Sequence, residues 1–168
     1  MEIITLSLIT IVSRIVPHLP NVTPVGAVAL FSSAKFGTRK SMIILFMSML
    51  MSDMVLGFHS VMWATYGSFM ITIIIGRWVQ KKYSLPRFLA ATLVSSVVFF
   101  LITNFAVWLI PHGMYAKNLA GVIHCYGMAL PFFRNSLMGD ILYGFIFYFG
   151  YELIYFWNHR FLLKVHQI

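Results

Sequence analysis

Two carboxylates inside long apolar stretches are the residues with the clearest chemistry. Asp53 and Asp140 each interrupt a run of apolar residues. A charged side chain at mid-bilayer depth costs about 2.5–3.5 kcal/mol on insertion scales, so it normally faces the bundle interior and has a partner there. The sequence therefore predicts that both acids accept hydrogen bonds from a ligand or balance a cationic group. The alternative is a structural role, as a packing bridge to Arg14 or Arg134 or as a helix cap.

A stripe of aromatic and polar side chains follows Asp53 at helical spacing. Its members are His59, Trp63, Tyr66 and Met70. Farther along the chain, Asn104 and Trp108 are four residues apart and would share one helix face. Flat aromatic walls with a few polar groups suit a ring-bearing ligand. The alternative is that the Trp and Tyr residues belong to the interfacial belt expected in any membrane protein.

His124 and Asn135 complete the predicted binding residues, in and just after a short apolar segment. His124 is followed by Cys125, and either side chain could ligate a borderline metal. However, the sequence has no HxxxH or CxxC spacing, so no metal and no cofactor is predicted. Neither a GxxxxGK[ST] phosphate-binding loop nor a GxSxG nucleophile motif is present. No catalytic residue is therefore predicted.

The composition indicates one integral membrane domain over residues 1–168. The chain is 60% hydrophobic and only 10% charged, which is far from the composition of a soluble domain. Its net charge of +8 comes from basic residues between apolar segments. These are typical of membrane topology signals, so nucleic-acid binding is not predicted. The N-terminus lacks a basic region and a small-residue cleavage site, and it is expected to be a retained membrane segment rather than a cleaved signal peptide.

The apolar segments predict an all-α membrane bundle with six transmembrane helices. Their expected ranges are 3–16, 24–36, 41–58, a fourth helix from the turn at His59 to about position 79, then 88–110 and 137–157. Thr23 is expected to cap the second helix, with Pro24 in its first position. Small residues in the second helix would let neighbouring backbones approach closely.

The segment 119–133 is predicted to be a short re-entrant or lid-like element. As a helix it would be about 22 Å long, less than a bilayer core of roughly 30 Å, and it ends near Pro131. Irregular backbone at membrane depth is tolerated where it lines a cavity, so a pocket is expected beside it. The segment 18–23 is expected to form a second lid. The alternative is that 119–133 makes a seventh crossing.

The basic loops favour one orientation. Placing 35–40, 77–87 and 158–168 in the cytoplasm puts nine of the 12 basic residues inside. Both termini are then cytoplasmic, and 119–133 enters and leaves from the outer face. A seventh crossing would instead put the basic tail outside.

Four sequence blocks resemble an uncharacterised family of small bacterial membrane proteins. The blocks are RIVPHLPNVTPVGAVALF, SDMVLGFH, TNFAVWL and LPFFRNSLMGD. The chain is more loosely similar to the substrate-binding S-components of energy-coupling-factor (ECF) vitamin transporters. That similarity implies a six-helix bundle with an outward-facing pocket under loop lids and a partner energy-coupling membrane module. Gly26, Ala29 and Ser33 only approximately match the small-residue motif that docks this partner.

Together these features predict a binding or uptake protein for a small, ring-bearing, vitamin-like micronutrient in the bacterial inner membrane. Its partners would be this substrate and the lipid bilayer. Two alternatives stay open. One is a membrane enzyme acting on a lipid or isoprenoid, which would use His59, His112 or His124. The other is a partner subunit without a ligand, whose outer cavity would be filled by side chains.

Overall fold

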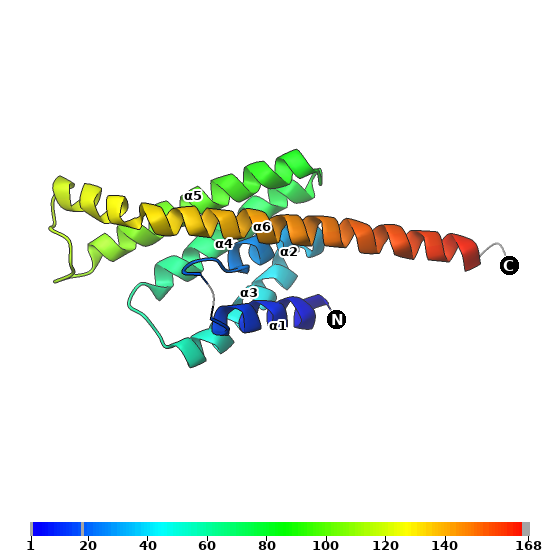
Figure 1. Cartoon of the computed structure of the whole chain (residues 1–168), viewed down its shortest axis with the longest axis horizontal. Coiled ribbons are helices and arrows are strands. Elements are labelled where there is room, and N and C mark those ends of the chain that lie inside the picture. Colours follow the sequence, from blue (N-terminus) through cyan, green and yellow to red (C-terminus); the bar gives the residue numbers. More distant parts are fainter. Residues whose placement is uncertain (1, 18, 166–168) are drawn as a thin grey trace.

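The computed structural model contains six helices and describes residues 2–17 and 19–165, with side chains through Trp157 (Figure 1). His18, from the predicted lid, lies outside these residues. The helices are α1 (Glu2–Ile15), α2 (Val25–Phe36), α3 (Thr38–Leu56), α4 (Met62–Gln80), α5 (Leu85–Leu109) and α6 (Leu119–Val165). The described residues contain no strand, so the predicted all-α class is confirmed for them.

Helix α2 lies at the centre of the bundle and contacts each of the other five helices. Its small side chains explain this position. Ser33 donates a hydrogen bond to the Ile73 carbonyl on α4 at 2.6 Å, and a Cβ added to Gly76 would lie only 2.6 Å from the Ser33 Cβ. Such close backbone approach requires small residues on both helices.

Glycines set two of the helix limits differently from the sequence prediction. Gly37 has a φ of 84° and alone joins α2 to α3, so α3 begins at Thr38 rather than at position 41. Gly57 has a φ of 94° and ends α3. Because L side chains rarely adopt these φ values, glycine suits both positions. Since α4 begins only at Met62, His59 lies in the connection and not on the predicted helical stripe.

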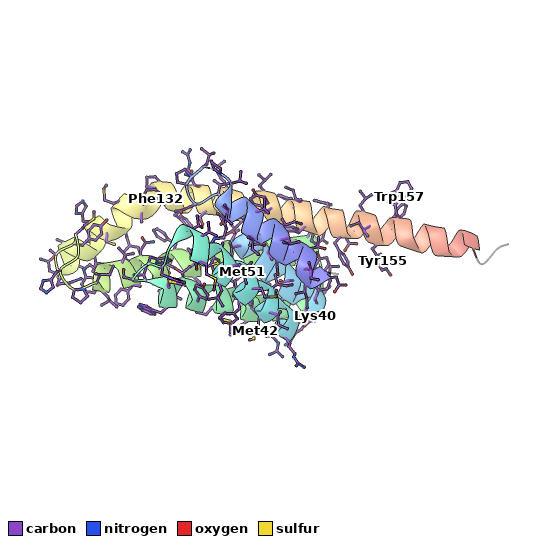
Figure 2. The ribbon with its side chains drawn as sticks, turned by 90° about the horizontal axis from the view of Figure 1, so that it is seen from below. Lys40, Met42, Met51, Phe132, Tyr155 and Trp157 are labelled. Carbon is purple, nitrogen blue, oxygen red and sulfur yellow. The ribbon has the colours of Figure 1, made fainter. Side chains whose placement is uncertain are left out.

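The prediction that 119–133 is a separate re-entrant segment is wrong. These residues form the first part of α6, a continuous helix of 47 residues with Pro131 inside it. Proline removes one helical hydrogen bond and kinks a helix without necessarily ending it. Figure 2 shows α6 bending near Phe132. Packing on α5 holds the segment, since the Tyr126 hydroxyl donates to the Leu101 carbonyl at 2.6 Å and the rings of Phe100 and Phe133 are 4.7 Å apart.

Two of the described helical stretches, Leu85–Leu109 and Leu119–Trp157, are long and apolar enough to cross a membrane. The other four helices do not combine that length with that hydropathy. Helices α1 and α2 have 14 and 12 residues, so they extend about 21 and 18 Å. Length and composition therefore support membrane association through α5 and α6.

Two ion pairs lie at one end of the bundle, where the connections between helices carry basic residues. Lys40 Nζ lies 3.2 Å from Glu2 Oε2, and Lys35 Nζ lies 3.1 Å from Glu152 Oε1. Lys35 Nζ also sits 3.3 Å from the centroid of the Tyr83 ring, in the α4–α5 connection. The start of α1 and the α2–α3 and α4–α5 connections consequently share one end. The connection after α1 lies elsewhere, where Asn135 of α6 donates to the Pro20 carbonyl at 3.2 Å.

Candidate functional site

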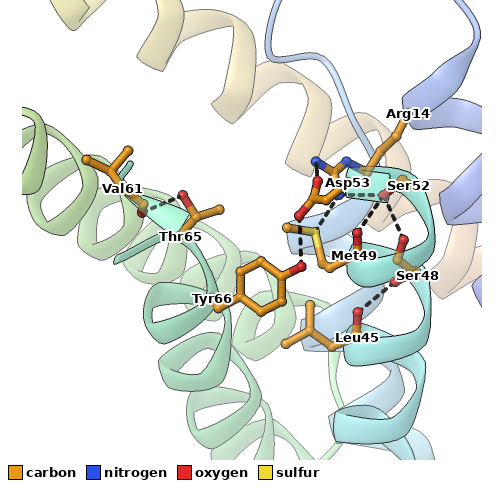
Figure 3. Close-up of polar contacts among 9 residues, drawn as sticks. All are labelled: Arg14, Leu45, Ser48, Met49, Ser52, Asp53, Val61, Thr65 and Tyr66. Carbon is orange, nitrogen blue, oxygen red and sulfur yellow. Dashed lines mark hydrogen bonds and ion pairs between the residues drawn. The ribbon is translucent and has the colours of Figure 1, made fainter. Parts of the chain in front are cut away.

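Arg14 and Asp53 form a buried ion pair between α1 and α3 (Figure 3). Arg14 Nη2 donates to Asp53 Oδ1 at 2.7 Å, and the two side chains are 15% and 2% exposed. Arg14 Nη1 donates to Ser52 Oγ at 2.6 Å and to Met49 Sδ at 2.9 Å. The Tyr66 hydroxyl on α4 donates to the other carboxylate oxygen of Asp53 at 2.8 Å. The cluster thus ties three helices together and uses both oxygens of Asp53.

The positions of the pair on their helices favour this arrangement. Arg14 lies in the last turn of α1, where a cation interacts favourably with the partial negative charge of the helix end. Asp53 lies close to the end of α3, and its carbonyl accepts a hydrogen bond from the Gly57 amide. The structure therefore contains the predicted alternative for Asp53, an ion pair with Arg14 that joins two helices.

Asp140 points its carboxylate at the first turn of α2. Its Oδ2 accepts a hydrogen bond from Ser96 Oγ on α5 at 2.7 Å, and the Ala27 backbone amide donates to the same carboxylate. Gly26 lies directly against it, because a Cβ at that position would collide with Asp140 Oδ1. The cap residue of α2 is Pro24, with no side-chain capping bond, so the predicted Thr23 cap is wrong. Asp140, on α6, instead accepts the hydrogen bond from a backbone amide in the first turn of α2.

A cavity of about 400 Å³ lies between these two carboxylate clusters. Its polar lining includes Arg14, Asn21, Thr72, Ser95, Ser136 and Asp140, contributed by four helices and the loop after α1. Asn21 and Leu56 are exposed and mark the mouth. Thr72 and Ser95 are 2% and 5% exposed and mark the floor. The volume is in the range of small-molecule sites.

Among the described residues, the Ser95 hydroxyl has no hydrogen-bond partner although it is buried at this floor. Leaving a buried hydroxyl unpaired costs roughly 1–3 kcal/mol, so such groups normally find a partner. A ligand or water in the cavity would supply one. Ser95 is therefore available to a ligand or a water molecule in the cavity.

A second, smaller cavity of about 160 Å³ adjoins the first between α5 and α6. The two share Asn21, Phe99 and Ser136. Phe99 packs on Phe69 with ring centroids 4.8 Å apart, which gives the main cavity an aromatic wall. Asn104 lines the smaller cavity, although its amide group already donates to the Phe100 carbonyl at 2.8 Å.

Five of the nine predicted binding residues are brought to or next to these cavities. Asp140 and Asn104 line them. Asp53 pairs with Arg14, which lines the larger one, and Tyr66 donates its hydroxyl hydrogen bond to Asp53. Asn135 fixes the Pro20 carbonyl, next to the lining residue Asn21.

The other four predicted residues lie away from the described cavity linings. His59 and Trp63 are exposed at and after the α3–α4 connection. Trp108 Nε1 donates to the Ala116 carbonyl at 2.9 Å, so it holds the α5–α6 connection. His124 is exposed and packs its ring edge-on against Tyr115 at 5.6 Å. These four side chains therefore lie on the surface or contact the connections between helices, and they do not line either cavity.

Sequence reasoning missed Ser95, Thr72 and the Phe69–Phe99 wall. The one available sign was the Ser95-Ser96 pair, two adjacent hydroxyls in the middle of the most apolar segment. The described residues hold no group of three His, Cys, Asp or Glu side chains placed to bind a metal ion.

The chain belongs to a family of unknown function, DUF6580, which matches residues 1–162. This agrees with the resemblance to an uncharacterised family seen in the four sequence blocks. No curated protein and no solved structure matches the chain. The similarity to S-components therefore stays a prediction.

Proposed function

We propose that this chain is a multi-pass membrane protein that binds a small, ring-bearing nutrient in the cavity between Arg14 and Asp140. In this proposal it acts in uptake, in the manner of an S-component working with an energy-coupling membrane module. The observation that carries the proposal is a cavity of about 400 Å³ whose floor holds an unpartnered hydroxyl, Ser95. A purely structural subunit would be expected to fill that space with side chains.

The membrane setting is supported by how little of α6 is buried. Only 11% of the most apolar 18-residue window of α6 is buried inside the protein. Apolar side chains left exposed along such a length need a non-aqueous surrounding. Six crossings of the bacterial inner membrane would require the shorter helices α1, α2, α3 and α4 all to span beside α5 and α6.

The alternative of an enzyme acting on a lipid receives no support from the site. It would need a titratable group such as His59, His112 or His124 poised on a substrate. Within the described part of the chain, none of these histidines lines the cavity that contains Asp140 or the smaller cavity next to it.

Ligand binding is tested by analysing what the purified chain carries. Full-length protein extracted in detergent is denatured, and released small molecules are identified by mass spectrometry. Ser95→Leu, which fills the floor of the cavity, should remove the bound molecule, and Ser95→Ala should lower its occupancy. Ser7→Ala is the matched control, because Ser7 is also buried and unpartnered but lies in α1 outside the cavity linings. Wild-type occupancy in Ser95→Leu, or release of phospholipid alone, would refute the proposal.

Topology is tested by labelling single cysteines in intact cells. The native Cys125 is buried at 1% exposure and should not react with a membrane-impermeant maleimide. A cysteine replacing Met114, which is 90% exposed in the α5–α6 connection, should react from outside. A cysteine replacing Lys81, in the α4–α5 connection, should react only after the membrane is permeabilised. The reverse pattern would overturn the proposal that both termini are cytoplasmic.

A further inference from the structure

In the described part of the chain, every acid but one is balanced by a cation. The sequence contains four Asp and Glu residues. Asp53 pairs with Arg14 at 2.7 Å, and the Lys–Glu pairs described above account for Glu152 and Glu2. Asp140 is in contact with no Lys, Arg or His side chain in the described part of the chain. It is the acid that lines the cavity.

The other charges at the cavity do not compensate Asp140. Arg14 also lines the cavity, but its guanidinium is engaged by Asp53, Ser52 and Met49. The start of α2 contributes a partial positive charge of about one half at most. With Asp140 ionised, the charges of Arg14 and Asp53 cancel and the cavity carries a net negative charge.

The wall beside Asp140 is suited to a cation that carries a ring. Phe69 and Phe99 both line the cavity, and aromatic rings attract cations as well as stacked rings. The free Ser95 hydroxyl, one residue before the Asp140 partner Ser96, offers an acceptor for an N–H group. Charge, aromatic wall and unpaired hydroxyl thus converge in one space.

We propose that the cavity selects a ring-bearing ammonium ion, with Asp140 as its counter-ion, Ser95 as a hydrogen-bond partner and the Phe69–Phe99 pair as its aromatic wall. This inference rests on the proposed binding function and specifies the charge of its substrate class. Asp53 takes no direct part, because its carboxylate is already shared by Arg14 and Tyr66.

Two probes with one ring system and opposite charge test the proposal. Tryptamine and indole-3-propionate are titrated by calorimetry into purified full-length chain in detergent at neutral pH. Tryptamine should bind, and indole-3-propionate should bind at least tenfold more weakly. Asp140→Asn, which removes the charge and keeps the size of the side chain and one acceptor oxygen, should weaken tryptamine binding about tenfold or more. A tenfold change corresponds to about 1.4 kcal/mol. Ser95→Leu should block tryptamine while leaving the contacts of Asp140 in place.

Glu2→Gln is the matched control, because it removes the same charge from an exposed pair away from the cavity and should leave tryptamine affinity unchanged. The cation proposal is overturned if tryptamine does not bind, if Asp140→Asn does not change its affinity, or if indole-3-propionate binds more tightly. Binding of indole-3-propionate that Ser95→Leu blocks would refute the charge assignment and leave the proposed binding function standing. Absence of any co-purified molecule together with no binding of either probe would refute both.

Discussion

Arg14 and Asp53, 39 residues apart in the sequence, are joined by an ion pair of 2.7 Å that attaches α1 to the rest of the bundle. Helix α1 packs mainly on α3 and otherwise touches only α2 among the described helices. The pair also places Arg14 at the cavity wall. One interaction therefore serves both the assembly of the bundle and the shape of the site.

Asp53→Ala should destabilise the protein by about 3 kcal/mol or more, because it leaves the Arg14 guanidinium buried without a counter-charge. The free energy of unfolding in detergent measures this effect. Arg14→Met combined with Asp53→Leu should recover much of the loss, since neither charge then remains buried. Glu2→Gln is the control, because its pair with Lys40 is about half exposed and should contribute within about 1 kcal/mol. Equal losses for Asp53→Ala and Glu2→Gln would contradict the burial argument.

Tyr66→Phe should cost about 1.5–3 kcal/mol, because its hydroxyl hydrogen bond to Asp53 goes to a charged acceptor. The effect should be coupled to Asp53. A double-mutant cycle of Tyr66→Phe with Asp53→Asn should give an interaction energy of at least about 0.5 kcal/mol. Additive losses in that cycle would show that the hydroxyl acts independently of the carboxylate.

The helical segments could be predicted because apolar runs separated by basic or proline-containing connections mark them clearly. The position of Pro131 misled the prediction of 119–133, since proline usually marks a helix boundary. In the structure, contacts of Tyr126 and Phe133 with α5 lie on both sides of Pro131 and keep the helix continuous. Tertiary packing of this kind is not visible in a local sequence pattern.

The cavity could be predicted only in part. Asp53 and Asp140 stand out because carboxylates are costly among apolar residues, and the alternative partner Arg14 was evident for the same reason. The contributions of Ser95 and Phe99 on α5 were not, because the apolar residues of this helix are spread around its axis and do not mark an inward face. Phe99 and Ser95 become site residues only once α4, α5 and α6 are packed together.

Gly76→Ala should destabilise the bundle by about 1–3 kcal/mol, because the new methyl group would press on Ser33 and the Leu30 carbonyl of α2. Gly67→Ala is the matched control on the same helix, since no atom lies within 4 Å of its added Cβ. That substitution should be neutral or stabilising by up to about 1 kcal/mol through helix propensity. The free energy of unfolding in detergent is measured for both variants. Equal changes in this free energy for Gly76→Ala and Gly67→Ala would contradict the close packing of α2 on α4.

Gly26→Ala tests whether the cavity depends on the approach of Asp140 to the start of α2. The added methyl group would collide with the Asp140 carboxylate and push it away from the Ala27 amide. We expect a loss of about 1–3 kcal/mol in unfolding free energy together with a large fall in ligand occupancy. Gly127→Ala on α6 has nothing within 4 Å of its added Cβ and should change neither quantity appreciably. Because α2 contacts every other helix, a stability loss alone would report only packing. A Gly26→Ala protein that keeps full occupancy would show that ligand binding does not need Asp140 at this position.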